Sequence, residues 1–224
     1  MPSSPRPIEP ARVVSIPAGP AVLRGELTRL PASDRFIVFA QGSAASRHSP
    51  RNQAVARELH DTGFGTLLCD LLSDEEEAAD GRTSALRFDV GLLSARLLSA
   101  TRWLRAQFGQ LRLGYFGVNS GAAAALAAAA EDEHAVAAIV SRGGRPDLAG
   151  EALPHVRAPT LLLVGSHDGA LLDLNRYALE QLRCEKSLHL MRGATYRLEE
   201  PAVLAEIARQ AIAWFRRFMP RQPS

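Results

Sequence analysis

Short apolar runs alternate with longer segments of helical periodicity over most of this chain. The run 35–40, Arg-Phe-Ile-Val-Phe-Ala, is typical of a buried strand, whereas Val203, Ile207 and Ala211 fall on one stripe of a helix that begins at Pro201. We expect strands at 11–16, 21–28, 35–40, 65–69, 111–116, 136–140, 159–164 and 186–191. Helices are expected at 50–62, 85–107, 120–130, 172–183 and 201–218.

The order of these elements predicts one domain of the α/β class. Two strands come first without a helix between them, and strand–helix alternation follows, which favours a mostly parallel sheet with helices on both faces. A length of 224 residues suits one such domain, and no repeat or linker divides it. We therefore expect an eight-stranded α/β domain over 11–218, a flexible proline-rich tail over 1–10 and a short tail over 219–224. The connection 141–158 is too short for a large cap domain.

Composition excludes several classes of partner. Hydrophobic residues make up 46% of the chain, charged residues 22%, and the net charge of +2 predicts no strong attraction to nucleic acid or to an anionic membrane. No apolar stretch reaches the ~18 residues of a membrane span, and the N-terminus does not resemble a signal peptide. Two cysteines, Cys69 and Cys184, are too few for a disulfide framework, so we expect a cytoplasmic protein with reduced thiols. The acidic run 74–77 is interpreted as a solvated helix turn or loop.

The most informative segment is Gly117-Val-Asn119-Ser120-Gly121. It lies between an expected strand and an expected helix of small residues, which is the layout of the nucleophile elbow G-x-S-x-G. The nucleophile belongs at the central position, and that residue here is Asn119. An amide offers no proton that a base could usefully remove and no oxygen comparable to an alkoxide. Ser120 stands one position too late for the motif.

At this point the chain resembles the dienelactone-hydrolase-like branch of the α/β-hydrolases, over about 11–218. The stretches that carry the resemblance are Phe39–Ser43, Ser46–Asn52, Ser141–Leu148, Leu163–Asp168 and Gly193–Tyr196. The resemblance implies a cap-free α/β-hydrolase fold with strand order 1-2-4-3-5-6-7-8. It also implies a catalytic acid at Asp168 and a catalytic histidine at the position that Tyr196 occupies. Such proteins usually carry His-Gly where this chain has Gln41-Gly42, and we expect Gln41 to line the pocket.

The predicted triad is therefore degenerate. In a serine triad the histidine takes the proton of the serine and the acid fixes the histidine's tautomer. Tyrosine, with an ordinary pKa of ~10, is a poor base at neutral pH. Backbone N–H groups of Ser43 and Ser120 should still converge as an oxyanion hole, which without a nucleophile is a binding site for a carbonyl, a carboxylate or a similar acceptor.

Three functions stay open from the sequence. The chain is a non-hydrolytic protein that binds a small molecule or a protein partner through the former pocket. Alternatively it is an enzyme, for ester hydrolysis or proton transfer, that uses Ser120, Tyr196 or His48, or else a structural subunit of a complex. Arg142 and Arg145 either line the pocket and bind an anion or donate to backbone carbonyls. No metal-ligand spacing is present, so no metal and no cofactor are expected, and the sequence predicts no oligomeric state.

Overall fold

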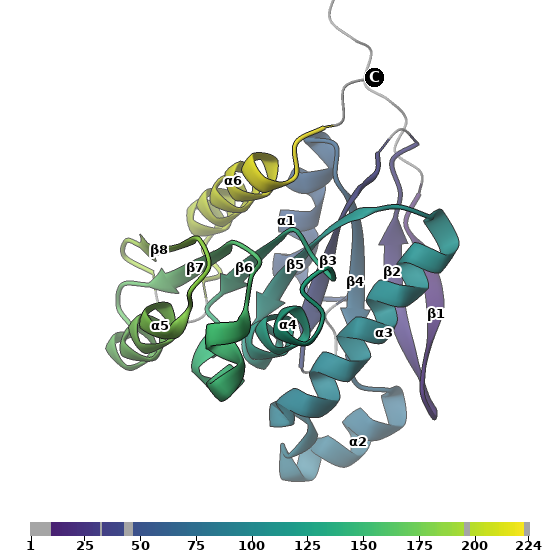
Figure 1. Ribbon diagram of the computed structural model, residues 1–224, viewed down its shortest axis with the longest axis horizontal. Coiled ribbons are helices and arrows are strands. Elements are labelled where there is room, and N and C mark those ends of the chain that lie inside the picture. Colours follow the sequence, from purple (N-terminus) through teal and green to yellow (C-terminus); the bar gives the residue numbers. More distant parts are fainter. Residues whose placement is uncertain (1–9, 32, 43–46, 195–197, 222–224) are drawn as a thin grey trace, which may run out of the picture.

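The computed structural model describes residues 10–31, 33–42, 47–194 and 198–221. Its centre is one eight-stranded sheet in the order β1-β2-β4-β3-β5-β6-β7-β8, with β1, β2 and β4 paired antiparallel and all other neighbours parallel (Figure 1). The strands are β1 (Arg12–Ala18), β2 (Ala21–Thr28), β3 (Arg35–Gln41), β4 (Gly65–Asp70), β5 (Arg112–Val118), β6 (Ala138–Arg142), β7 (Thr160–Gly165) and β8 (Lys186–Met191). The fold class and the strand order predicted above are thus confirmed.

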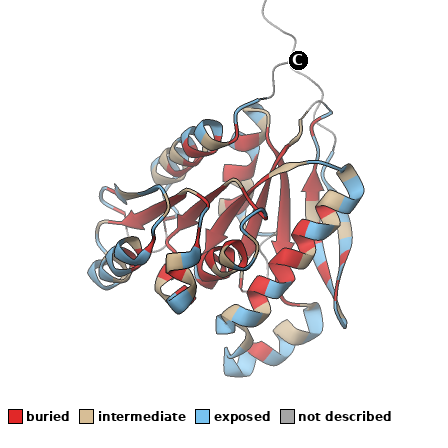
Figure 2. Ribbon diagram, in the orientation of Figure 1, coloured by how far each residue is buried: buried red, intermediate tan, exposed pale blue. Residues whose placement is uncertain are grey.

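Helices cover both faces of this sheet. They are α1 (Pro50–Asp61), α2 (Asp74–Thr83), α3 (Val90–Phe108), α4 (Ser120–Glu131), α5 (Gly169–Gln181) and α6 (Pro201–Phe218), with 3-10 segments η1 (Leu86–Phe88) and η2 (Pro146–His155). One core joins the sheet to α3, α4 and α5, and a second joins its other face to α1 and α6. Figure 2 shows the strands buried between the helices, whose outer surfaces are exposed. The near-continuous apolar runs of β3, β4 and β7 follow from this double cover.

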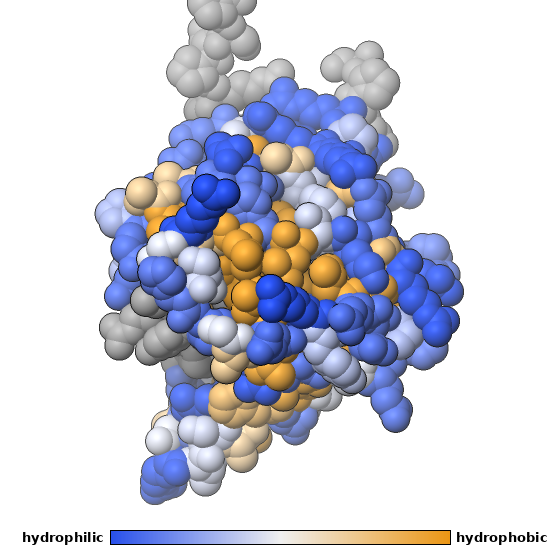
Figure 3. Space-filling view, turned by 90° about the vertical axis from the view of Figure 1, so that its left-hand side faces the viewer, coloured by the Kyte–Doolittle hydropathy of each residue, from blue (hydrophilic) through white to orange (hydrophobic). Residues whose placement is uncertain are grey.

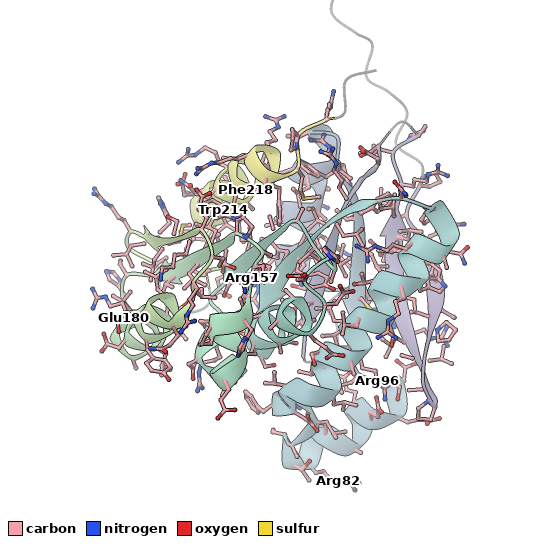
Figure 4. The ribbon with its side chains drawn as sticks, viewed as in Figure 1. Arg82, Arg96, Arg157, Glu180, Trp214 and Phe218 are labelled. Carbon is pink, nitrogen blue, oxygen red and sulfur yellow. The ribbon has the colours of Figure 1, made fainter. Side chains whose placement is uncertain are left out.

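The aromatic end of α6 secures that helix to the sheet. Trp214 and Phe218 lie on neighbouring turns of α6 and pack edge to face, with ring centroids 4.8 Å apart (Figure 4). The Trp214 indole N–H donates to the carbonyl of Pro159, just before β7, over 3.2 Å. The helix predicted at 201–218 therefore has the predicted boundaries, and its apolar stripe contributes Ile207, Ala211 and Phe215 to the core.

Two helical segments were missed by the periodicity argument. The acidic run 74–77, interpreted above as a solvated helix turn or loop, is a helix turn, because it forms the first turn of α2, but the rest of α2 was not predicted. Ser73 and Glu76 form a reciprocal capping box at the N-terminus of this helix. This helix has almost no apolar face and is held by ion pairs, Arg96 to Glu76 over 2.7 Å and Arg87 to the buried Asp80. The connection 141–158 contains η2, although it carries no large cap, as predicted.

Side-chain caps also move two predicted boundaries. The helix expected at 85–107 begins at Val90, because Asp89 caps it by accepting from the N–H of Leu92, and η1 occupies the residues before it. The helix expected at 172–183 begins at Gly169, because Asp168 accepts from the N–H of Leu171 over 3.0 Å.

The sheet ends at β8, which has no further strand beside it in the part of the chain that the structure describes. Figure 3 views the molecule from the side of the sheet where β8 lies, and apolar side chains gather there inside a hydrophilic surround. Leu190 of β8 is 39% exposed. The strand is only six residues long and begins with Lys186, two features that limit edge-to-edge pairing.

A pair of glycine substitutions tests the close packing of α4 against the sheet. A Cβ on Gly121 would lie 2.1 Å from the carbonyl oxygen of Ala40, whereas a Cβ on Gly81, in the exposed α2, would meet nothing within 4 Å. Gly121→Ala should lower the free energy of unfolding by ~1–3 kcal/mol. Gly81→Ala should raise it by ~0.5–1 kcal/mol, since alanine favours the helix. Urea unfolding followed by circular dichroism measures both, and equal effects of the two changes would contradict this packing.

Candidate active site at the carboxyl edge of the sheet

The segment predicted as an elbow forms the turn between β5 and α4. Asn119 has φ 52° and ψ −125°, a backbone conformation that side chains other than glycine rarely adopt. Two amides hold the turn, because the Asn119 carbonyl accepts from the N–H of Ala122 over 3.2 Å and from that of Arg145 over 3.0 Å. The Asn119 residue itself is exposed at this edge. The strained geometry of an elbow is thus built around an amide side chain.

The glycines on either side of Asn119 allow this turn. A Cβ on Gly117 would lie 2.5 Å from the Cα of Ala122, so the end of β5 and the start of α4 are in backbone contact. Gly121 makes the corresponding approach to Ala40 of β3. The spacing of the two glycines in the motif therefore has a steric cause, because neither position has room for a Cβ.

Ser120 has its hydroxyl turned away from the exposed side of the elbow. The residue is 3% exposed, and its Oγ lies against Gly42, where it would be 2.3 Å from an added Cβ. The carbonyl of Arg87 approaches the same point from η1. The side chain of Ser120 therefore fills a contact between α4 and the segment after β3. Ser43, the other predicted oxyanion donor, lies outside the described residues.

Polar contacts hold the end of β3 and the residues just before α1. Gln41 accepts through Oε1 from the Nδ2 of Asn52 on α1 over 2.9 Å. Arg47 forms an ion pair with the buried Asp70 at the end of β4, with Nε and Oδ2 2.7 Å apart. Ser49 caps α1 by accepting from the N–H of Asn52. Gln41, predicted to line the pocket, thus also ties β3 to α1.

Asp168 stands after β7, where the resemblance places the acid. Its carboxylate is half-buried and caps α5, as described above. The neighbouring N–H groups of Ser166 and His167 donate to the carbonyls of Met191 and Ala194, so the end of β7 is bound to the turn after β8. Tyr196 follows that turn but lies outside the described residues. The structure therefore gives the position of Asp168 but not that of Tyr196.

Arg142 and Arg145 differ sharply in their surroundings. Arg145 makes a two-pronged ion pair with Asp147, at 2.8 and 2.7 Å, and the hydrogen bonds from this carboxylate raise the pKa of Arg145. Arg142 is 4% exposed, and burial together with the charge of Arg51 lowers the pKa of Arg142 to about 10. Arg145 is thus a structural residue that holds its own loop, while the guanidinium of Arg142 is buried at the end of β6.

Other reactive side chains are poorly placed for nucleophilic chemistry. Burial raises the pKa of the Cys69 thiol at the end of β4, and burial is also the main cause of the raised pKa of Cys184. His48 and His167 are both exposed. Within the described residues, no group of three histidine, cysteine or acidic side chains could hold a metal ion, and no helix there is long and apolar enough to cross a membrane.

A cavity of about 360 Å³ that the sequence did not indicate lies apart from the elbow, between β2, β4 and α1. Glu26, Arg57 and His60 line it together with apolar residues. Burial lowers the pKa of His60 to about 4, and its ring lies 2.8 Å from the hydroxyl of Thr66. None of the residues predicted for the site lines this cavity.

Several known proteins share this architecture. The crystal structure of a dienelactone hydrolase from Anabaena variabilis is 47% identical and covers 93% of this chain and 98% of its own, with a TM-score of 0.89. A lid-free α/β serine hydrolase from Xanthomonas campestris (21% identity, TM-score 0.74, 97% and 100% covered) and a dienelactone-hydrolase-like promiscuous phosphotriesterase from metagenomic libraries (18%, 0.75, 94% and 98%) share the fold. No protein-family profile matches the chain.

Two curated proteins of Mycobacterium tuberculosis are also similar to this chain. Both are provisionally named phosphoribosyl transferases, and they are 48% identical over 205 residues. The match takes in 90% of this chain but only 45% of each relative, so the chain spans less than half of their length.

The strained elbow yields a stability prediction. Asn119→Gly should raise the free energy of unfolding by ~1 kcal/mol, because glycine adopts φ 52° and ψ −125° without the strain that a Cβ imposes there. Asn119→Ser keeps the Cβ and should shift the melting temperature by only a few degrees. Urea and thermal unfolding of the three proteins measure this. A loss of stability in both variants would mean that the Asn119 amide makes a stabilising hydrogen bond, contrary to the account.

Proposed function

From the premise that this chain belongs to the dienelactone hydrolase family of α/β-hydrolases, we propose that it is a non-hydrolytic member that binds a small molecule through the former active-site pocket. The observation that carries the proposal is Asn119. It occupies the nucleophile position of an elbow whose strained backbone and flanking glycines are in place. The turn at Asn119 both supports binding and argues against hydrolysis.

Ester hydrolysis by a triad needs a hydroxyl or thiol that a base can deprotonate. The amide of Asn119 supplies neither. The helix α4 nevertheless begins directly after it, so the positive end of the helix dipole faces the carboxyl edge of the sheet. A site with hydrogen-bond donors and no nucleophile favours binding of an acceptor group over its chemical attack.

Substitute nucleophiles and bases are poorly supported. The hydroxyl of Ser120 is buried against Gly42, and the thiol of Cys69 is fully buried with a raised pKa. His48 and His167 are exposed on turns, and no hydrogen bond to another described residue orients either imidazole ring. A Tyr196 phenol in place of the histidine would have to act as a base well below its ordinary pKa.

A second candidate function is that of a module within a larger assembly. The relatives provisionally named phosphoribosyl transferases are more than twice as long as the segment they share with this chain. In them, this unit is joined to a substantial further length of polypeptide. Their name describes the longer proteins, of which this chain spans less than half.

Covalent labelling tests the absence of a nucleophile. We expect no adduct after incubation with an organophosphonate directed at serine hydrolases, because the elbow presents an amide. Intact-mass spectrometry measures the outcome. A single adduct that maps to Ser120 would contradict the proposal and favour the enzyme with altered machinery.

Restoring two side chains tests whether the site is a former triad. The double change Asn119→Ser with Tyr196→His should give measurable hydrolysis of a short p-nitrophenyl ester, while each single change stays near background, because triad members act as a unit. Gln41→His is the additional change if the segment after β3 sets the oxyanion geometry. Background rates in a correctly folded double variant would show that the pocket is not a recoverable triad.

A further inference from the structure

The five buried charged residues in the described part of the chain are Arg35, Asp70, Asp80, Arg96 and Arg142. Four of them have clear partners. Arg35 donates to the carbonyls of Met219 and Gly63, Asp70 pairs with Arg47, Asp80 with Arg87, and Arg96 with Glu76. Arg142 is the exception: none of the described residues forms a hydrogen bond or an ion pair with its guanidinium, and its Nη1 is completely buried.

Such an arrangement is costly for a folded protein. A buried charge is normally paired, because removing it from water without compensation is strongly unfavourable. The lowered pKa of Arg142 has the same origin, and a pKa of about 10 still leaves the group charged at neutral pH. The buried guanidinium of Arg142 therefore has no counter-ion among the described residues.

Strand register places Arg142 beside the elbow. Gln41, Val118 and Arg142 are consecutive cross-strand neighbours on β3, β5 and β6, so their side chains lie on one face of the sheet. Val118 directly precedes Asn119 and packs into the core under α1 and α6, which identifies that face. With strands ~4.8 Å apart, Gln41 and Arg142 are about 10 Å from one another across β5.

A second cation adds to the positive character of this place. Arg51, in the first turn of α1, is close enough for its charge to lower the pKa of Arg142. The side chain of Arg51 is 39% exposed, and its Nη1 lies 3.8 Å from Oε2 of Glu199. The start of α4 contributes the positive end of its dipole to the same edge. A buried cation and a partly exposed cation thus lie near one another at this edge of the sheet.

From these observations we infer that the former active-site pocket binds the oxyanion of a small molecule, a carboxylate or a phosphate, with Arg142 as its buried cationic anchor and Arg51 at the entrance. The inference rests on the proposed binding function and names the chemistry of the ligand. The planar guanidinium matches both oxyanions, since it can donate two parallel hydrogen bonds to either. A neutral ligand would leave the charge of Arg142 uncompensated.

Inorganic phosphate and succinate serve as probes, with chloride at matched ionic strength as the control for a general salt effect. Thermal unfolding and isothermal titration calorimetry are measured for the wild type, Arg142→Met and Arg96→Met. The wild type should show a saturable rise in melting temperature with at least one of the two probes and none with chloride. Saturation by phosphate alone identifies a phosphate site, by succinate alone a carboxylate site, and either result supports the inference.

The two variants separate binding from structure. Arg142→Met should unfold at the same temperature as the wild type or higher without a probe, because it removes an unpaired buried charge, and it should lose the saturable rise. Arg96→Met removes a buried arginine that is paired, on the opposite face of the sheet, and should lower the melting temperature while the probe effect persists. Arg142→Lys keeps the positive charge but loses the planar guanidinium with its two parallel donors. It should weaken binding of the probe about tenfold or more. This variant also keeps the inference testable if Arg142→Met does not fold.

The inference is overturned if neither probe saturates, if chloride acts equally, or if Arg142→Met binds the probe as the wild type does. A strong loss of stability in both Arg142→Met and Arg142→Lys without a probe would also overturn it, because it would mark Arg142 as a structural donor. These outcomes are distinct from failure of the proposed function. That function fails on ester turnover or covalent labelling, whereas an inert protein that ignores both oxyanions loses only the inference about its ligand.

Discussion

The backbone contact between α4 and the two central strands is the constraint on which the rest of the structure depends. Gly117 and Gly121 bring β5, α4 and β3 so close together that a single methyl group at either position would collide with backbone atoms. The residue between them is forced to a positive φ, and Asn119 accepts that conformation. The same contact buries the hydroxyl of Ser120 against Gly42, at the end of β3, and the carbonyl of Asn119 accepts from the N–H of Arg145 in the loop after β6.

Around this contact the protein has the framework of an α/β-hydrolase. The carbonyl of Asn119 is held by two amides, Asp168 caps α5, and Gln41 joins β3 to α1. All three residues thus make hydrogen bonds that hold the elements of the fold together. The buried guanidinium of Arg142, by contrast, makes no hydrogen bond to a described residue. It lies two strands from Gln41 on the same face of the sheet.

The parts that the sequence predicted well are those set by strong local rules. Continuous apolar runs marked β3, β4 and β7, and the stripe of Val203, Ile207 and Ala211 marked α6 with its start and end. The glycine spacing around Asn119 marked the elbow, because few other patterns join a strand to a helix in this way.

The missed features depend on contacts between distant residues. The helix α2 is stabilised by a capping box and by ion pairs to Arg87 and Arg96, none of which produces apolar periodicity. The roles of Arg142 and Arg145 looked alike in the sequence. The register of β6 shows that Arg142 is a buried cation, and the ion pair with Asp147 shows that Arg145 is a structural residue of its loop.

The most direct test of the central claim, that the elbow binds but does not attack, is the pre-steady-state time course of p-nitrophenyl acetate with the wild type and with Asn119→Ala. The account predicts no burst of p-nitrophenol and the same slow background release from both proteins, since neither has a nucleophile at the turn. A burst stoichiometric with the wild-type protein that disappears in Asn119→Ala would show an acyl-enzyme formed at this site and would contradict the account.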